Sequence, residues 1–197
     1  MFTSPYEGYP EQEWLGITQQ LVNDFPLSNE VLISIVESAW EDIYSSSLGS
    51  SQLKIGQDIF LPAQATGVIL EKLIAMILVN QYDGWRGSQA KHEKDIVCSF
   101  NDRYSFEIKT SSSKSGLYGN RSTGHRSDNR LKYRTGYYLV INYKLPTEDD
   151  LNRQIWKIRF GWIDDEDWLG QKKPTGQQAS IGAKLASLKL ITLKHYP

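Results

Sequence analysis

The chain has 197 residues, of which 40% are hydrophobic and 12% aromatic, so it is long and apolar enough to fold around its own core. Its net charge of −1 gives no overall attraction to nucleic acid, and its single cysteine, Cys98, excludes an intramolecular disulfide. The longest apolar run, at 74–79, is too short to span a bilayer, and residues 1–13 lack the features of a signal peptide. We therefore expect a cytoplasmic protein with no membrane partner.

The first part of the chain is expected to be helical. Apolar residues recur at helical spacing in 14–25 and 28–44, where Ser28 is the expected N-cap, and most clearly in 63–81. A short extended piece is expected at 56–61. Glu71 lies beside the apolar face of the third helix, either as an exposed helix residue or as a carboxylate directed at the next segment of the chain.

The segment 94–110 alternates apolar and polar residues on both sides of an Asn-Asp turn, which predicts one β-hairpin. A three-residue loop at 101–103 would pair Phe100 with Tyr104, Cys98 with Phe106 and Ile96 with Ile108 on a buried face. Cys98 would then be a small core residue. The opposite face would then carry three charged side chains, and a slip by one residue would scatter the apolar pairs over both faces. These charged residues are Asp95, Glu107 and Lys109.

Two carboxylates and an amine at one point suit a specific chemistry. Carboxylate oxygens are ligands for Mg²⁺, and a lysine can orient a water or offset charge on a phosphate. The pattern therefore indicates phosphodiester hydrolysis, although a surface Asp–Lys pair is the structural alternative. In the loop expected at 83–88, Arg86 could meet a phosphate, and Glu93, on the same strand face as Asp95, could assist the metal.

A basic segment lies directly after the hairpin. Residues 109–134 contain seven Lys or Arg and one acid, Asp128, which indicates a surface for phosphates or, alternatively, a solvated basic loop. This segment is rich in Gly and Ser, and long polar loops within a domain are usually functional or disordered. Its side chains of the types that contact bases or phosphates are Lys114, Tyr118, Asn120 and Arg121.

The remaining chain predicts three more strands, at 135–143 (a central strand), 154–163 and 187–193. The acidic run 164–167 is expected to start a helix rather than to bind a metal. We find no repeat, and we expect a single domain over 1–197. Its parts would be a helical N-terminal region (1–62), a catalytic core (63–143) and C-terminal strands with a DNA-contacting loop (144–197).

A helix followed by Asp95 and then by Glu107-Ile108-Lys109 resembles the core of the PD-(D/E)XK nucleases, with Lys94 where a proline is often found. Longer segments are similar to ScaI-type restriction endonucleases. These segments, which together lie within 67–181, are EKDIVCSF, EIKTSSSKSGLYGNRS and IRFGWIDDEDWLGQKKPTGQQAS.

The resemblance implies an α/β, restriction endonuclease-like fold with a mixed central sheet flanked by helices. It also implies a Mg²⁺-dependent type II endonuclease that cuts a short palindromic site in double-stranded DNA. Asp95 and Glu107 would bind the metal, Lys109 would be catalytic, and Glu71 is our candidate for a third acid. We expect 5′-phosphate products and, because a palindrome is read twice, a homodimer.

We infer that the loops at 113–125 and 170–178 read bases, the second loop through Gln171, Lys172 and Gln177. Two alternatives remain open from the residues. One is a repair or junction-resolving nuclease with the same catalytic site, and the other is a non-catalytic DNA-binding regulator.

Overall fold

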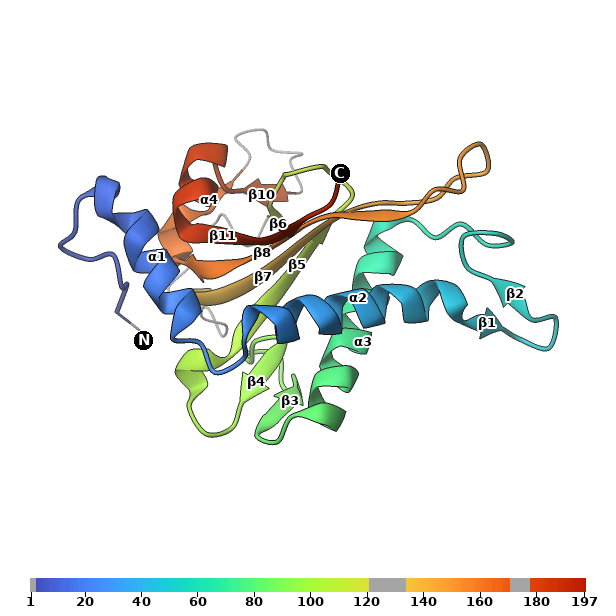
Figure 1. The fold of residues 1–197 in the computed structure, drawn as a ribbon, viewed down its shortest axis with the longest axis horizontal. Coiled ribbons are helices and arrows are strands. Elements are labelled where there is room, and N and C mark those ends of the chain that lie inside the picture. The colour runs from blue at the N-terminus through green and yellow to red at the C-terminus, as the bar shows by residue number, and fades with distance from the viewer. Residues whose placement is uncertain (1–2, 121–133, 171–177) are drawn as a thin grey trace.

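The computed structural model describes residues 3–120, 134–170 and 178–197 (Figure 1). Within these residues the main sheet has six strands in the order β11-β8-β7-β5-β4-β3. Strands β5 and β7 are parallel and the other neighbours are antiparallel, so the sheet is mixed, as predicted. The strands are β3 (Trp85–Gly87), β4 (Ile96–Cys98), β5 (Phe106–Ser111), β7 (Gly136–Lys144), β8 (Gln154–Ile163) and β11 (Leu190–His195).

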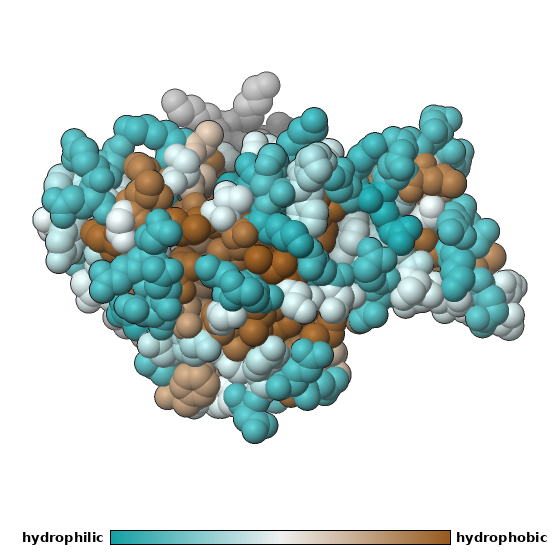
Figure 2. Space-filling model, in the orientation of Figure 1, coloured by the Kyte–Doolittle hydropathy of each residue, from teal (hydrophilic) through white to brown (hydrophobic). Residues whose placement is uncertain are grey.

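Three helices cover one face of this sheet. They are α1 (Trp14–Asn23), preceded by the short η1 (Glu11–Glu13), α2 (Asn29–Ser45) and α3 (Ala63–Gln81). Ser28 caps α2 as predicted, since its side chain accepts the N–H of Val31. The main core forms between these helices and alternate residues of the strands. From the same viewpoint, hydrophobic residues gather in the central part of the visible face, and hydrophilic residues surround them (Figure 2).

The opposite face of the sheet carries a second, smaller core. A three-stranded sheet in the order β6-β10-β9 and the helix α4 (Ala183–Lys189) lie on it. Central strand β7 contributes Tyr137 and Leu139 to the first core and Tyr138 and Val140 to the second, which explains its continuous apolar sequence. The small sheet consists of β6 (Tyr118–Asn120), β10 (Gln178–Ser180) and β9 (Leu169–Gly170).

Helix α3 is long and apolar enough to cross a bilayer by length and composition alone. In this structure it packs against α2, β3 and β5, and buries Leu70, Ile74 and Leu78 in the main core. A hairpin of β1 (Ser47–Leu48) and β2 (Leu53–Lys54) lies between α2 and α3 in the chain and projects away from the main sheet (Figure 1).

The helix predicted at 63–81 and the strand predicted at 154–163 match α3 and β8. The predicted register of the hairpin is wrong by two residues, because Ile96 rather than Cys98 pairs with Phe106. The turn is longer than predicted and contains a 3-10 helix, η2 (Asp102–Tyr104), capped by the Asn101 side chain, and Phe100 is 59% exposed. A shift by two residues preserves which face each side chain occupies, so Ile96, Cys98, Phe106 and Ile108 are buried as predicted, whereas Phe100 from the same predicted face is exposed.

Three other expectations are wrong in part. The segment 187–193 begins within α4, and the strand starts only at Leu190. The loop expected at 83–88 contains β3, and 56–61 holds no strand, since Ile59 makes only an isolated bridge to Ile55. The acidic run does start a short helix, the 3-10 helix η4 (Asp165–Asp167), with a capping box between Asp164 and Asp167.

Candidate active site

The end of β4 brings Asp95 beside β5. Strands β4 and β5 share one pair of register partners, Ile96 and Phe106. Next to this pair, the Asp95 carboxylate accepts a hydrogen bond from the backbone N–H of Ile108 at 2.8 Å. This hydrogen bond ties the side chain to the strand that carries the Glu-x-Lys sequence. Glu107 and Lys109 lie two residues apart on β5 and therefore point to the same face of the sheet.

The ammonium group of Lys109 lies among three oxygens. Its Nζ is 3.3 Å from Oε2 of Glu107, 4.0 Å from Oδ2 of Asp95 and 3.2 Å from the carbonyl oxygen of Ile108. The structure thus brings together the three residues that the sequence singled out. Their side chains are shielded from solvent, with exposures of 14% for Asp95, 4% for Glu107 and 26% for Lys109. Shielding strengthens the interactions of these charges with one another and with any bound ligand.

Helix α3 places Glu71 near this group. The helix lies directly on β5 because it carries Gly67 at the contact, where an added Cβ would come within 2.3 Å of the Thr110 hydroxyl. Burial, and then the negative charge of Asp95, raise the pKa of Glu71. The Glu71 carboxylate accepts a hydrogen bond from the neighbouring Lys72. The charge of Asp95 therefore affects the pKa of Glu71, but Glu71 lies outside the group formed by Asp95, Glu107 and Lys109.

Two further candidates around the hairpin, Arg86 and Glu93, lie next to each other. Arg86 and Glu93 form an ion pair with each other, with two hydrogen bonds from the guanidinium to the carboxylate. Glu93 also accepts the backbone N–H groups of Gln89 and Ala90, and its pKa is lowered to about 2, chiefly by the bond from Arg86. Glu93 thus stabilises the conformation of the loop before β4 through its contacts with Arg86, Gln89 and Ala90.

Sequence reasoning missed two features. The first is the backbone carbonyl of Ile108, which accepts a hydrogen bond from the Lys109 ammonium group and adds a third oxygen around it. The only sequence signal for this contact was that Ile108 lies between Glu107 and Lys109. Lys94, noted only in place of a proline, is buried, donates to the carbonyl of Thr135 and lies 5.7 Å from the ring centroid of Tyr138. Its position directly before Asp95 was the only hint.

The small sheet joins the two segments that we expected to contact DNA. Asn120 on β6 pairs with Gln178 on β10, and Tyr118 pairs with Ser180, so chain segments about 60 residues apart lie side by side. Lys114, Tyr118 and Asn120 are exposed, and the Lys114 ammonium lies 5.5 Å from the ring centroid of Trp156. The other four candidates, Arg121, Gln171, Lys172 and Gln177, lie outside the described residues.

The oxygen donors near Lys109 fit a magnesium ion. Within the described ranges no group of three or more His, Cys, Asp or Glu side chains is arranged to hold a metal. Mg²⁺ does not require such a group, because it keeps several waters and usually takes one or two carboxylates together with phosphate oxygens. Asp95 and Glu107 supply two carboxylates, and both already lie close to the positive charge of Lys109. Their oxygens are therefore suited to a hard cation such as Mg²⁺.

Comparisons with known proteins identify the family to which the chain is similar. A family model described as ScaI restriction endonuclease matches residues 4–194. The chain is 38% identical over 193 residues to the type II restriction enzyme ScaI of Streptomyces caespitosus, a match that covers 96% of this chain and 84% of that protein. Among solved structures, the restriction endonuclease BglI bound to its DNA recognition sequence matches 92% of this chain and 88% of that chain, with 13% identity and a TM-score of 0.41. The family match and the sequence identity show that the chain belongs to the ScaI family of type II restriction endonucleases and is a site-specific DNA nuclease.

Proposed function

We propose that Asp95, Glu107 and Lys109 are the catalytic site of a Mg²⁺-dependent enzyme of the PD-(D/E)XK type. The observation that carries this proposal is the position of the Lys109 ammonium within 4.0 Å of both carboxylates on one face of the sheet. The substrate would be a short palindromic site in double-stranded DNA, and the enzyme would act in the cytoplasm. Family membership favours this nuclease over a non-catalytic regulator and over a junction-resolving enzyme.

The chemistry would be hydrolysis of a phosphodiester. Asp95 and Glu107 would hold Mg²⁺. When bound, this ion would act as a Lewis acid that lowers the pKa of a water molecule and neutralises charge on the phosphate. Lys109 would orient the attacking water and offset the charge that develops on the phosphate oxygens. The water forms the new P–O bond as the bond to the 3′ oxygen breaks in line, which leaves a 5′ phosphate and a 3′ hydroxyl.

Glu71 is the candidate for an auxiliary acid. The effect of Asp95 on its pKa indicates that it is within electrostatic reach of the site, and helix α3 fixes its position against β5. We assign recognition of the DNA to the two segments around the small sheet. The residues in this assignment are Lys114, Tyr118, Asn120, Arg121, Gln171, Lys172 and Gln177.

A palindromic site presents the same contacts twice, so we propose a homodimer with two-fold symmetry. Sedimentation of the purified protein should give twice the mass of one chain. A monomer at concentrations where plasmid is cut would contradict this part of the proposal.

Plasmid digestion tests the main proposal. The wild type with Mg²⁺ should give discrete bands whose ends ligate without prior phosphorylation, as 5′ phosphates require. Asp95→Ala and Lys109→Ala should lose cleavage by at least about 100-fold, the scale of removing one transition-state contact. Asp150→Ala, at a charged and half-exposed loop position, is the control and should cut normally. Equal cleavage by all four proteins would refute the proposed site, and a preference for branched DNA without discrete bands would indicate a junction-resolving enzyme.

A further inference from the structure

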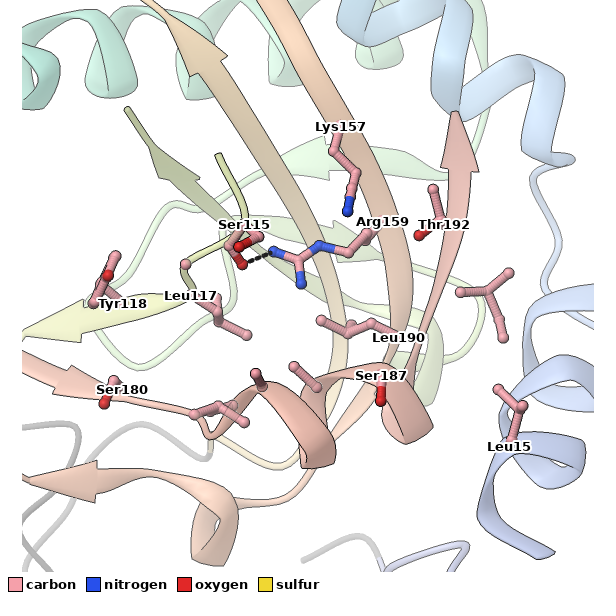
Figure 3. A pocket seen from close by; sticks show the side chains of 15 residues that line it. Leu15, Ser115, Leu117, Tyr118, Lys157, Arg159, Ser180, Ser187, Leu190 and Thr192 are labelled. Carbon is pink, nitrogen blue, oxygen red and sulfur yellow. Dashed lines mark hydrogen bonds between the residues drawn. The ribbon is translucent and has the colours of Figure 1, made fainter. Parts of the chain in front are cut away.

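A separate cavity lies on the same face of the main sheet, farther from β4. It has a volume of about 540 Å³ and lies between β8, β11, α4 and the segment that leads into β6. Figure 3 shows that Lys157 and Arg159 from β8 and Thr192 from β11 lie side by side at one end of this cavity. Apolar side chains form much of the remaining wall, including Leu117 and Leu190.

The charge in this cavity is positive. Lys157 and Arg159 lie two residues apart on one side of β8, with a Cα separation of about 7 Å. None of the described residues that line the cavity is acidic, and no described carboxylate forms an ion pair with either side chain. Two like charges next to an apolar wall repel each other and lose hydration, which an anionic ligand would offset.

Arg159 is built into the cavity. It is only 7% exposed, and its Nη2 donates to the carbonyl of Ser115 at 2.9 Å and to the side-chain oxygen of Asn142 at 2.8 Å. Both acceptors are neutral, and the Nε–H of Arg159 is buried with no hydrogen-bond partner among the described residues. Burial also lowers the pKa of its guanidinium. The two neutral acceptors leave the positive charge of Arg159 without a carboxylate partner among the described residues.

We propose that this cavity binds a phosphate group through Lys157 and Arg159. Guanidinium and ammonium groups are the usual partners of phosphate oxygens, and the Thr192 hydroxyl at the same end adds a further polar contact. The cavity is larger than a phosphate ion needs, so the group belongs either to the DNA backbone or to a small phosphate compound.

The DNA backbone is the source that the geometry favours, and this choice rests on the proposed function. Lys109, Val140 and Arg159 are register partners across β5, β7 and β8, so Arg159 and Lys109 are about two strand spacings, or about 10 Å, apart. That distance is about three base-pair steps along DNA. Tyr118 and Ser180, from the strands that border the proposed DNA-reading segments, also line the cavity.

The first arm of the test titrates inorganic phosphate into the full-length protein by calorimetry, without Mg²⁺ or DNA. Lys157→Gln should weaken binding at least tenfold, and Lys157→Arg should largely restore it. Lys194→Gln removes the same charge from the neighbouring strand, where Lys194 pairs with Glu37 away from the cavity, and should bind phosphate as the wild type does. Lys157 is only half-buried, so its variants should melt at the wild-type temperature.

The second arm measures binding to a linear plasmid fragment in Ca²⁺ across a KCl series. Loss of one phosphate contact should reduce the slope of log K against log[salt] by about 0.9 in Lys157→Gln but not in Lys194→Gln. A changed slope identifies the DNA backbone, whereas weakened phosphate binding with an unchanged slope identifies a small phosphate compound. If Lys157→Gln matches the wild type in both arms, the pocket proposal is overturned. The phosphate titration needs no cleavage, so it decides the pocket even if Asp95→Ala still cuts DNA.

Discussion

At the scale of single residues, Asp95 combines a structural and a proposed catalytic role. Its carboxylate accepts the Ile108 N–H, so removing the whole side chain leaves a shielded backbone donor unsatisfied. We predict that Asp95→Ala lowers the free energy of unfolding by about 1–3 kcal/mol in urea titrations. Asp95→Asn keeps an acceptor oxygen and should stay within about 1 kcal/mol of the wild type. Both variants should lose cleavage, and full activity in stable Asp95→Asn would show that the charge is not needed.

Glu71 gives a prediction that depends on pH. Burial and the charge of Asp95 raise its pKa in the folded state, so its contribution to stability is fully present below the unfolded-state pKa and is lost as the pH rises through the folded-state pKa. Glu71→Gln, which cannot ionise, should therefore melt at a higher temperature than the wild type at pH 8, with a smaller difference at pH 4. Melting curves at the two pH values check this, and a difference that grows on acidification would contradict it.

At the scale of elements, Gly161 allows β11 to lie against β8. A Cβ at this position would come within 2.2 Å of the Lys189 carbonyl oxygen and 3.0 Å of the Leu190 Cα, and both are backbone atoms that cannot rotate away. Gly161→Ala should therefore destabilise the fold by about 3 kcal/mol, at the upper end for an overfilled core. Gly182→Ala, which has open space around it before α4, is the matched control. Equal urea midpoints for the two variants would contradict this contact.

The hairpin shows how much of an element its sequence determines. Alternation of apolar and polar residues placed Ile96, Cys98, Phe106 and Ile108 correctly in the core, because burial depends on the face of the strand. The pairing was wrong because two registers that differ by two residues bury the same set. The choice between them depends on the turn, where the Asn101 cap and η2 lengthen the connection. The charged face of the site was thus predictable, but the contact between Asp95 and Ile108 was not.

At the scale of the whole molecule, a buried ion cluster joins segments from both ends of the chain. Lys189, 3% exposed, contacts Asp164 at 2.7 Å and Asp167 at 2.8 Å, and its ammonium lies 4.4 Å from the ring centroid of Tyr6. Asp164 also accepts from the Ser4 hydroxyl. The sequence showed only an acidic run at 164–167, since a buried partner from α4 has no local signal.

Replacing Lys189 should lower the free energy of unfolding, because Asp164 and Asp167 lose their cationic partner. Lys189→Met leaves two buried carboxylates without their cation, so we predict a loss of about 3–5 kcal/mol at pH 7. Burial raises the pKa of Asp167, and Lys189 partly offsets this effect. In Lys189→Met the pKa of Asp167 should therefore be higher still, and the loss of stability relative to the wild type should become smaller as the pH falls. Lys184→Met, 81% exposed on the same helix, should cost about 0.5 kcal/mol or less. Unfolding titrations at pH 7 and pH 5 check both, and a deficit independent of pH would contradict the account.

The arrangement of distant segments was the least predictable part. Pairing of β6 with β10 and the cavity behind them depend on chain segments that meet only in the folded protein, and short strands of two or three residues leave little pattern in a sequence. The central sheet was predictable because β7 and β8 are long and strongly patterned. Sequence patterns therefore located the candidate catalytic residues but not the surfaces around them.

The central claim is that Lys109 is catalytic in the cleavage of DNA, beside a metal ion that Asp95 and Glu107 would hold. Single-turnover cleavage by Lys109→Ala, with DNA binding measured separately in Ca²⁺, tests it most directly. The account predicts binding within about threefold of the wild type and a cleavage rate at least about 100-fold lower. A variant that binds normally and cleaves at the wild-type rate would contradict the account.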